Sequence, residues 1–149
     1  MKEKMKFGFF CENCGSWVTK DQFIGTHFRN HCPLCLYSKH VDTRDSGDRK
    51  SSCHGLMKPI GLTFKKEGFD KYGQKRQGEL MLIHHCLECH DFSINRLAAD
   101  DQSEMVMLIF EQSQDLPSDV KNDLQSQKIE LLAAKDETEI RNQLFGKKV

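Results

Sequence analysis

The chain has 149 residues, of which 38% are hydrophobic, enough for one ordinary domain or for a small domain with an appendage. No segment approaches the roughly 18 consecutive apolar residues that a membrane-spanning helix needs, so the composition predicts no membrane partner. The net charge of zero hides a division, because residues 1–99 contain 16 Lys+Arg and 11 Asp+Glu (+5), whereas residues 100–149 contain 6 and 11 (−5). This asymmetry predicts different partners for the two parts, or docking of one part on the other.

Seven cysteines form three Cys-x-x-Cys pairs and one single residue: Cys11/Cys14, Cys32/Cys35, Cys86/Cys89 and Cys53. The odd number and the charged residues 1–6, which do not resemble a signal peptide, argue against a secreted disulfide framework. A thioredoxin-like redox centre is disfavoured because no βαβ pattern surrounds a pair. We therefore expect reduced thiols in a cytoplasmic protein. Spacing alone leaves iron–sulfur ligation open.

The first two pairs are separated by 17 residues, which fits the Cys-x2-Cys-x15–20-Cys-x2-Cys spacing of a four-thiolate zinc site. Residues 7–10 are predicted to form a short strand before the first pair, and Trp17-Val18 a second one. Two knuckles that face one ion are typical of a zinc ribbon. Such a fold depends on its metal, because a ribbon buries too little apolar surface alone.

A second zinc site is predicted further along the chain. The polar residues 41–52 read as a loop, followed by a strand over residues 56–64 and a returning strand over residues 79–85. A hairpin of these strands would bring Cys53 near Cys86 and Cys89, which supply three thiolates. His40 is the preferred fourth ligand, with Asp42 as its hydrogen-bond partner. His84 is the main alternative, because it shares a strand face with Cys86. The further candidates for this position are His31, His54, His85, His90 and water.

The segment between these strands is basic and aromatic. Residues 65–76 contain five basic residues and two aromatic ones: Lys65, Lys66, Lys71, Lys75, Arg76, Phe69 and Tyr72. Basic side chains neutralise phosphates and aromatic rings stack on unpaired bases, so this segment is a candidate RNA-binding surface. Solvated charge at a hairpin tip is the simpler alternative. Arg29 and Asn30, beside the second knuckle, are further nucleic-acid candidates; they could equally hold the loops around the ribbon.

The C-terminal residues 100–149 have helical periodicity. Asp100 or Asp101 is expected to cap a helix that ends near Gln114. A second helix is predicted from Pro117 or Ser118 to about Ala134, and a third, capped by Asp136, ends before Gly146. Their apolar stripes are sparse, so the segment must bury them elsewhere. We expect a protein partner or a mobile arm rather than docking on the metal-bearing part.

The run Arg29-Asn30-His31-Cys32-Pro33 resembles the signature of the RNHCP-domain family. Further matching positions follow: Cys35-Leu36, Ser38, His40-Val41-Asp42, Gly47-Asp48-Arg49, Cys53, Gly55, Met57, Pro59-Ile60, His84, Cys86, Cys89 and Asn95-Arg96. The resemblance covers about residues 7–101. It implies a small bacterial zinc-ribbon-like domain and no particular activity. His90 departs from the family pattern, which has glycine there.

Together these features predict a small metal-stabilised α+β protein: a zinc-ribbon-like domain (1–99) holding two Zn²⁺, followed by an acidic helical extension (100–149). The preferred function is structural zinc binding combined with RNA binding, on the ribosome or the translation apparatus, without catalysis. One alternative is a metal-dependent hydrolase or nuclease that uses Asp42, Asp48 or His31 as general base. Another is a protein–protein adaptor acting through residues 100–149.

Overall fold

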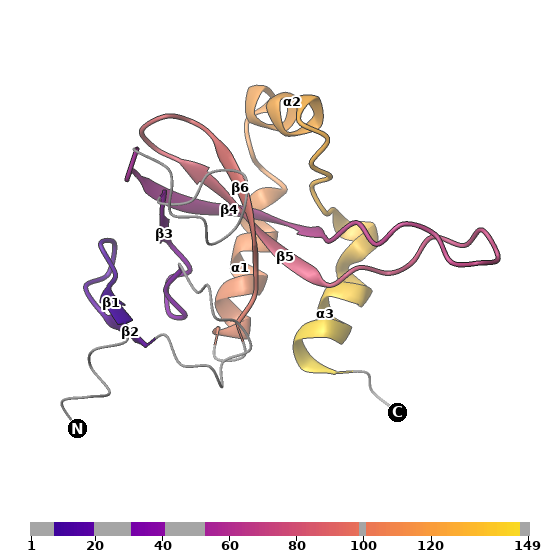
Figure 1. The fold of residues 1–149 in the computed structure, drawn as a ribbon, viewed down its shortest axis with the longest axis horizontal. Helices are drawn as coiled ribbons and strands as arrows, with labels where there is room; N and C mark the ends of the chain where they lie inside the picture. Colours follow the sequence, from indigo (N-terminus) through magenta and orange to yellow (C-terminus); the bar gives the residue numbers. More distant parts are fainter. Residues whose placement is uncertain (1–7, 20–30, 41–52, 99–100, 147–149) are drawn as a thin grey trace.

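The computed structural model describes residues 8–19, 31–40, 53–98 and 101–146. Strands come first and helices last, as Figure 1 shows, and the predicted α+β class is confirmed. The strands are β1 (Gly8–Phe10), β2 (Trp17–Thr19), β3 (Ser38–Lys39), β4 (Leu56–Phe64), β5 (Leu80–Cys86) and β6 (Phe92–Arg96). The helical elements are α1 (Ser103–Ser113), α2 (Ser118–Ser126), the 3-10 turn η3 (Ala134–Asp136) and α3 (Glu137–Phe145).

The strands form two antiparallel sheets. β1 and β2 make a separate hairpin, and the larger sheet has the order β3-β4-β5-β6. The predicted pairing of β4 with β5 is present, with a shift of register between Pro59 and Gly61. Proline lacks an N–H for the ladder and is therefore tolerated at such an irregularity. β6 was not predicted from the sequence; it places Ser93 opposite His84 and Phe92 opposite His85.

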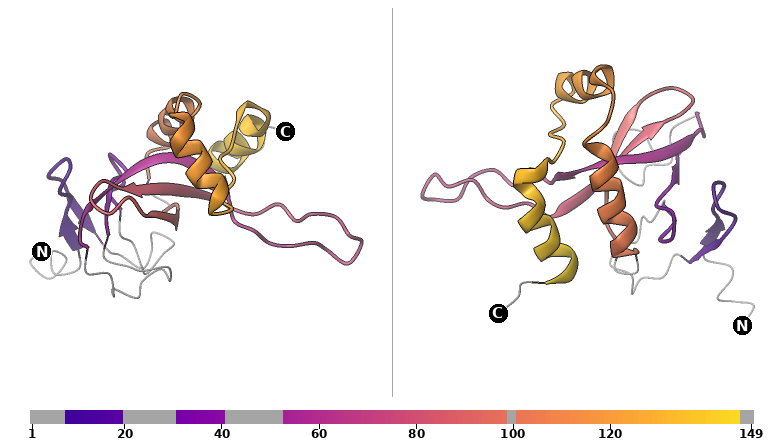
Figure 2. Two further views of the ribbon diagram at one scale, coloured as in Figure 1. Left: turned by 90° about the horizontal axis from the view of Figure 1, so that it is seen from above. Right: turned by 180° about the vertical axis from the view of Figure 1, so that it is seen from behind.

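Between the end of β4 at Phe64 and the start of β5 at Leu80, the chain forms a long arm that leaves the body of the molecule (Figures 1 and 2). Its base is closed by a hydrogen bond from the Lys65 N–H to the Glu79 carbonyl oxygen (2.9 Å), and an isolated bridge pairs Phe69 with Lys75. A Cβ atom at Gly78 would overlap the Lys65 carbonyl group. The close approach of the two chains at this point therefore requires glycine.

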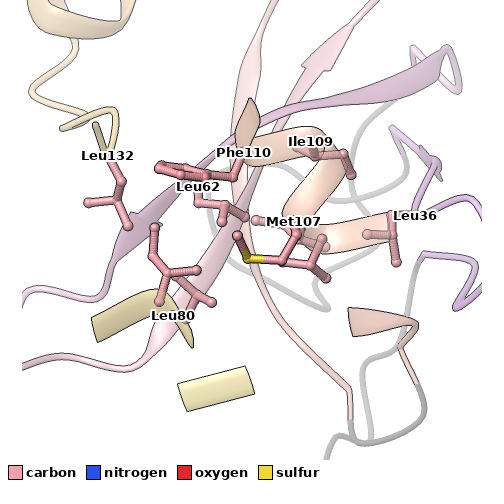
Figure 3. Packing of buried hydrophobic residues seen from close by; sticks show 10 residues of the cluster. Leu36, Leu62, Leu80, Met107, Ile109, Phe110 and Leu132 are labelled. Carbon is pink, nitrogen blue, oxygen red and sulfur yellow. The ribbon is translucent and has the colours of Figure 1, made fainter. Parts of the chain in front are cut away.

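The main core lies between the central strands and the helices. Figure 3 shows Leu62 and Leu80 of the strands packed with Met107 and Phe110 of α1 and with Leu132. A second cluster joins Ile60 and Ile83 to Leu124 of α2. Leu82 and Ile83 are successive, fully buried residues that belong to different clusters. Because successive residues of a strand point to opposite faces, both faces of β5 are covered.

The expectation of a partner-bound or mobile helical segment is not what the described residues show. Val106, Ile109 and Ile140 of the helices are all buried in the core that the sheet supplies. The helices thus bury these apolar side chains against the strands of the same chain. The division of the chain into a domain over residues 1–99 and a helical extension over residues 100–149 stays a prediction. No helix in the described ranges has the length and apolar character needed to cross a membrane.

The second helix is shorter than predicted, because α2 ends at Ser126 instead of continuing to Ala134. Lys128 has a left-handed backbone (φ 61°). Its N–H donates to the Gln125 carbonyl (3.0 Å), and the Ile129 N–H donates to the Leu124 carbonyl (2.9 Å). This is a Schellman ending, closed by packing of Ile129 near Leu124. The chain then becomes extended, and the Leu132 N–H bonds to the Leu62 carbonyl (2.9 Å).

Candidate metal centres

The three Cys-x-x-Cys segments share one backbone geometry. In each, the N–H of the first cysteine donates to a carbonyl five residues later: Cys11 to Ser16 (2.8 Å), Cys32 to Tyr37 (2.9 Å) and Cys86 to Asp91 (2.8 Å). The residue after the second cysteine donates back to the first: Gly15 to Cys11 (2.8 Å), Leu36 to Cys32 (2.8 Å) and His90 to Cys86 (3.1 Å). These bonds turn both thiols of a pair toward the same point, as a metal-binding knuckle requires.

The first group consists of the two pairs predicted to share an ion, Cys11 and Cys14 before β2 with Cys32 and Cys35 before β3. Their sulfur atoms all lie within 4.8 Å of one another. Cys11 Sγ is 3.5 Å from Cys35 Sγ, and Cys14 Sγ is 3.6 Å from Cys32 Sγ. Four sulfurs on a tetrahedral zinc ion with bonds of about 2.3 Å would be about 3.8 Å apart. The group therefore has the size of a four-thiolate zinc site.

The second group contains His40, Cys53, Cys86 and Cys89, whose ligand atoms also lie within 4.8 Å of one another. Cys53 Sγ is 3.6 Å from Cys86 Sγ, and His40 Nδ1 is 3.2 Å from Cys89 Sγ. Three thiols and an imidazole are a donor set of structural zinc sites. Within each group the ligand atoms lie close enough together to hold one zinc ion, so the two groups can hold two, as predicted.

Backbone bonds position the second group. The His40 N–H donates to the Gly55 carbonyl (2.8 Å), and the His54 N–H donates to the His40 carbonyl (3.0 Å). These bonds hold the end of β3 against the start of β4. A Cβ atom at Gly55 would lie 2.9 Å from Cys86 Sγ and 2.6 Å from Glu88 Cγ. Only glycine leaves room there for the third knuckle.

The thiols of each group differ in acidity in the metal-free protein. Burial raises the pKa of the Cys35 thiol to about 12. Hydrogen bonds from the side chain and backbone of Ser16 lower the pKa of Cys14 to about 6. Burial alone would raise the pKa of Cys86, but N–H groups of Cys89 and Glu88 lower that pKa to about 7. Because zinc binds thiolates, metal binding would displace protons from the less acidic members.

His84, the alternative ligand, lies away from the second group. Its Nε2 is 2.6 Å from the Leu36 carbonyl oxygen, and its Nδ1 is 2.9 Å from Asn95 Nδ2. A carbonyl oxygen can only accept, so Nε2–H donates to Leu36 and Nδ1 accepts from Asn95. Burial, with the nearby His31, lowers the pKa of His84 to about 3. The structure thus brings His40, and not His84, to the three thiols.

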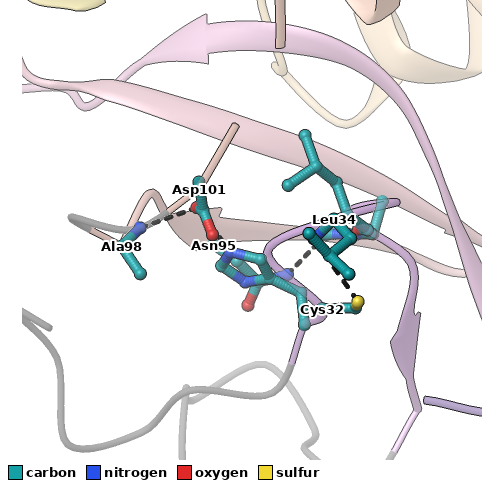
Figure 4. A network of polar contacts seen from close by, with 8 residues as sticks. Cys32, Leu34, Asn95, Ala98 and Asp101 are labelled. Carbon is teal, nitrogen blue, oxygen red and sulfur yellow. Dashed lines mark hydrogen bonds and ion pairs between the residues drawn. The ribbon is translucent and has the colours of Figure 1, made fainter. Parts of the chain in front are cut away.

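His31 and Asp101 form a buried pair beside this histidine, and Figure 4 shows the bond between Asp101 and Ala98. His31 Nε2 lies 2.7 Å from Asp101 Oδ2, and the same oxygen accepts the Ala98 N–H at 2.7 Å. Asp101 was expected to cap α1, but the residue at the N-cap is Gln102. No spacing in the sequence signalled this contact, because its partners are 70 residues apart. The sequence-based expectations also missed Asn95, which lies on the unpredicted β6.

The predicted nucleic-acid residues of the 65–76 segment all lie in the protruding arm, from its base at Lys65 outward (Figure 1). Phe69 and Tyr72 are 69% and 77% exposed. The remaining candidates, Arg29 and Asn30, lie outside the described residues. So do Asp42 and Asp48, two of the three candidate general bases of the hydrolase alternative; the third, His31, is described.

The family model of the RNHCP domain matches residues 6–107, more than half of the chain. The chain belongs to the RNHCP family. The match includes both cysteine groups and the His31–Cys32–Pro33 run, and it ends within α1. No curated protein and no solved structure matches the chain.

Proposed function

We propose that this RNHCP protein is a structural zinc protein that binds RNA, with ribosomal RNA as its expected ligand. In this proposal Cys11, Cys14, Cys32 and Cys35 hold one Zn²⁺, and His40, Cys53, Cys86 and Cys89 hold the other. Each set supplies four donors, which fills a tetrahedral zinc ion and leaves no position for a reactive water. The closed donor sets therefore favour a scaffold over the hydrolase alternative.

The observation that carries the proposal is the protruding arm. Its two aromatic rings point into solvent, although aromatic side chains usually bury their surface. Lys71 Nζ lies 5.2 Å from the centre of the Tyr72 ring. Exposed rings interleaved with cations are what single-stranded RNA needs, because the rings stack on bases and the cations meet phosphates.

Hydrogen bonds of Asp70 shape the turn at the tip of the arm. Asp70 Oδ1 accepts the N–H groups of Tyr72 (2.8 Å) and Gln74 (2.9 Å), and the Asp70 N–H donates to the Gln74 carbonyl (2.8 Å). Only two acidic residues, Glu67 and Asp70, oppose the five basic ones in residues 65–76. A preorganised tip loses less entropy on binding, so its aromatic residues can contribute more to affinity.

The test measures binding of an unstructured oligouridine as a function of salt. Changing Lys65, Lys66, Lys71, Lys75 and Arg76 to Ser should weaken binding, because the phosphates lose their cationic partners. The dependence of log K on log[salt] should also flatten, by about 0.7 for each phosphate contact that is lost. Phe69→Ala and Tyr72→Ala should each cost about 1–3 kcal/mol, the usual contribution of a base stacked on an aromatic ring.

The control removes the same charge elsewhere, in a variant with Lys58, Arg96, Lys121, Lys135 and Arg141 changed to Ser; Phe145→Ala is the aromatic control. Equal weakening by both charge variants would show a non-specific effect of net charge. An unchanged slope in the arm variant would assign the arm to plain solvent exposure. Sedimentation with ribosomes, with and without a salt wash, tests the ribosomal assignment separately.

A further inference from the structure

Four buried polar side chains lie behind the second knuckle: His31, His84, Asn95 and Asp101. His31 is 1% exposed, His84 is fully buried, Asn95 is 6% exposed, and the Asp101 side chain is 3% exposed. The rings of His31 and His84 are 6.0 Å apart. Polar groups this deeply buried are costly unless they are hydrogen-bonded, so such a network constrains the elements that it joins.

The network holds both ends of the second knuckle. His31 precedes Cys32, and its Nε2–H donates to Asp101 just before α1 (2.7 Å). Leu36 follows Cys35, and its carbonyl accepts from His84 of β5 (2.6 Å). The two cysteines between these contacts are therefore fixed relative to the large sheet and to the first helix.

The same elements carry the second metal group. His84 is two residues before Cys86 in β5, so both side chains lie on one face of the strand. Asn95 of β6 donates to His84 Nδ1 (2.9 Å) and to Ser93 Oγ (3.1 Å). The chain also runs directly from Cys35 through β3 to His40, only five residues later. A structural change at either metal group therefore reaches the strands and the knuckle that hold the other group.

We propose that this network couples the two metal centres, so that zinc binding is cooperative. His84 and Asp101 are positioning residues in this proposal, since they act on ligands through His31 and Leu36. Zinc at one site fixes the second knuckle against β5, which lowers the cost of ordering the other site. Such coupling is reciprocal and typically amounts to a 5- to 150-fold change in affinity. The proposal rests on zinc occupancy and does not depend on RNA binding.

The experiment removes zinc stepwise from the full zinc-loaded chain with a chelator and counts the species with two, one and no zinc ions by native mass spectrometry. The wild-type protein should lose both ions in one transition with little one-zinc species. His84→Leu, which removes the bond to Leu36, should split the loss into two steps and make the one-zinc species abundant. His84→Gln keeps an amide donor for Leu36 and should restore the single transition in part.

His85→Leu is the matched control, because His85 is the next residue of β5, points to the opposite face and should retain the single transition. A variant that is only less stable would lose both ions earlier but still together, which separates coupling from stability. If His84→Leu does not fold, Asp101→Asn should show the same splitting. Two independent steps in the wild type, or one step in every network variant that folds, would overturn the proposal.

Discussion

The residue after the second cysteine of each knuckle has a left-handed backbone. Gly15 (φ 79°), Leu36 (φ 65°) and His90 (φ 68°) all occupy this region, which costs a residue with a Cβ atom roughly 1–2 kcal/mol. Leu36 is fully buried in the main core, so its packing offsets the strain. The His90 side chain is exposed, and its ring makes a tilted contact with the His85 ring at 5.8 Å.

His90→Gly should therefore stabilise the zinc-loaded protein by about 0.5–1 kcal/mol, because glycine relieves the strained backbone and loses only part of the gain to unfolded-state entropy. Urea unfolding at constant free zinc measures the change.

Gly15→Ala is the converse control. Apart from Gly15 and its chain neighbours, no atom of the described residues lies within 4 Å of the position of a Cβ there, so the expected loss of about 1–2 kcal/mol comes from the backbone. Destabilisation by His90→Gly would mean that the contact with His85 outweighs the backbone strain.

At the scale of the elements, α3 completes the edge of β5. The Gln143 amide accepts the Leu80 N–H at Oε1 (2.7 Å) and donates from Nε2 to the Gly78 carbonyl (3.0 Å). One side chain thus imitates a neighbouring strand at the point where the protruding arm joins the sheet. Lys66 Nζ, on the opposite side of the arm, donates to the Lys128 carbonyl (2.8 Å). The acidic extension and the basic arm are in contact at both places.

Gln143→Ala should lower the free energy of unfolding by about 1–3 kcal/mol, because it leaves the buried Leu80 N–H without its partner and removes one of the two side-chain donors to the Gly78 carbonyl, the other being Gln77. Amide exchange at Leu80 should become faster by a corresponding factor. Arg141→Ala on the same helix removes only an exposed ion pair with Glu137 (2.8 Å) and should cost about 0.3–0.5 kcal/mol. Equal effects of the two substitutions would contradict a role of Gln143 in the sheet edge.

At the scale of the whole molecule, the two parts of the fold have unequal cores. The β1–β2 hairpin is packed through a small cluster of Cys11, Val18 and Cys32 with Phe9 and Cys35, most of whose members are thiols. The larger sheet shares with the helices a core of ten buried residues. A small module of the first kind depends on its metal, which can contribute about 10–16 kcal/mol of folding free energy.

Zinc removal should therefore release the β1–β2 hairpin first. Hydrogen exchange of residues 8–19 should accelerate strongly after chelation, whereas β4 and β5 should stay protected longer because the helices cover them. Readdition of zinc should restore protection, which controls for irreversible oxidation of the thiols. Persistent protection of residues 8–19 in metal-free protein would show that this hairpin does not need its ion.

The sequence by itself determined features that depend on short distances along the chain. The spacing of the cysteines was enough to predict three knuckles and the four-thiolate group, because a Cys-x-x-Cys turn closes locally. The second group needed the predicted hairpin as well, which brings Cys53 near the third knuckle. The mainly apolar runs of β4 and β5, with the polar segment between them, were enough to predict their hairpin. Helical periodicity and Asp136 were enough for α1 and α3, since caps and apolar stripes are local signals.

Only the tertiary structure decided the features that depend on contacts between distant segments. His40 was the preferred fourth ligand and His84 its main alternative until β3 placed His40 beside the thiols and β5 turned His84 toward Leu36 and Asn95. Asp101 had the local pattern of a helix cap, yet it bonds to His31. The apolar stripes of α1 to α3 required burial without indicating the surface. Hydrophobic burial is not directional, so only the assembled sheet could show that the surface was β4 and β5 of the same chain.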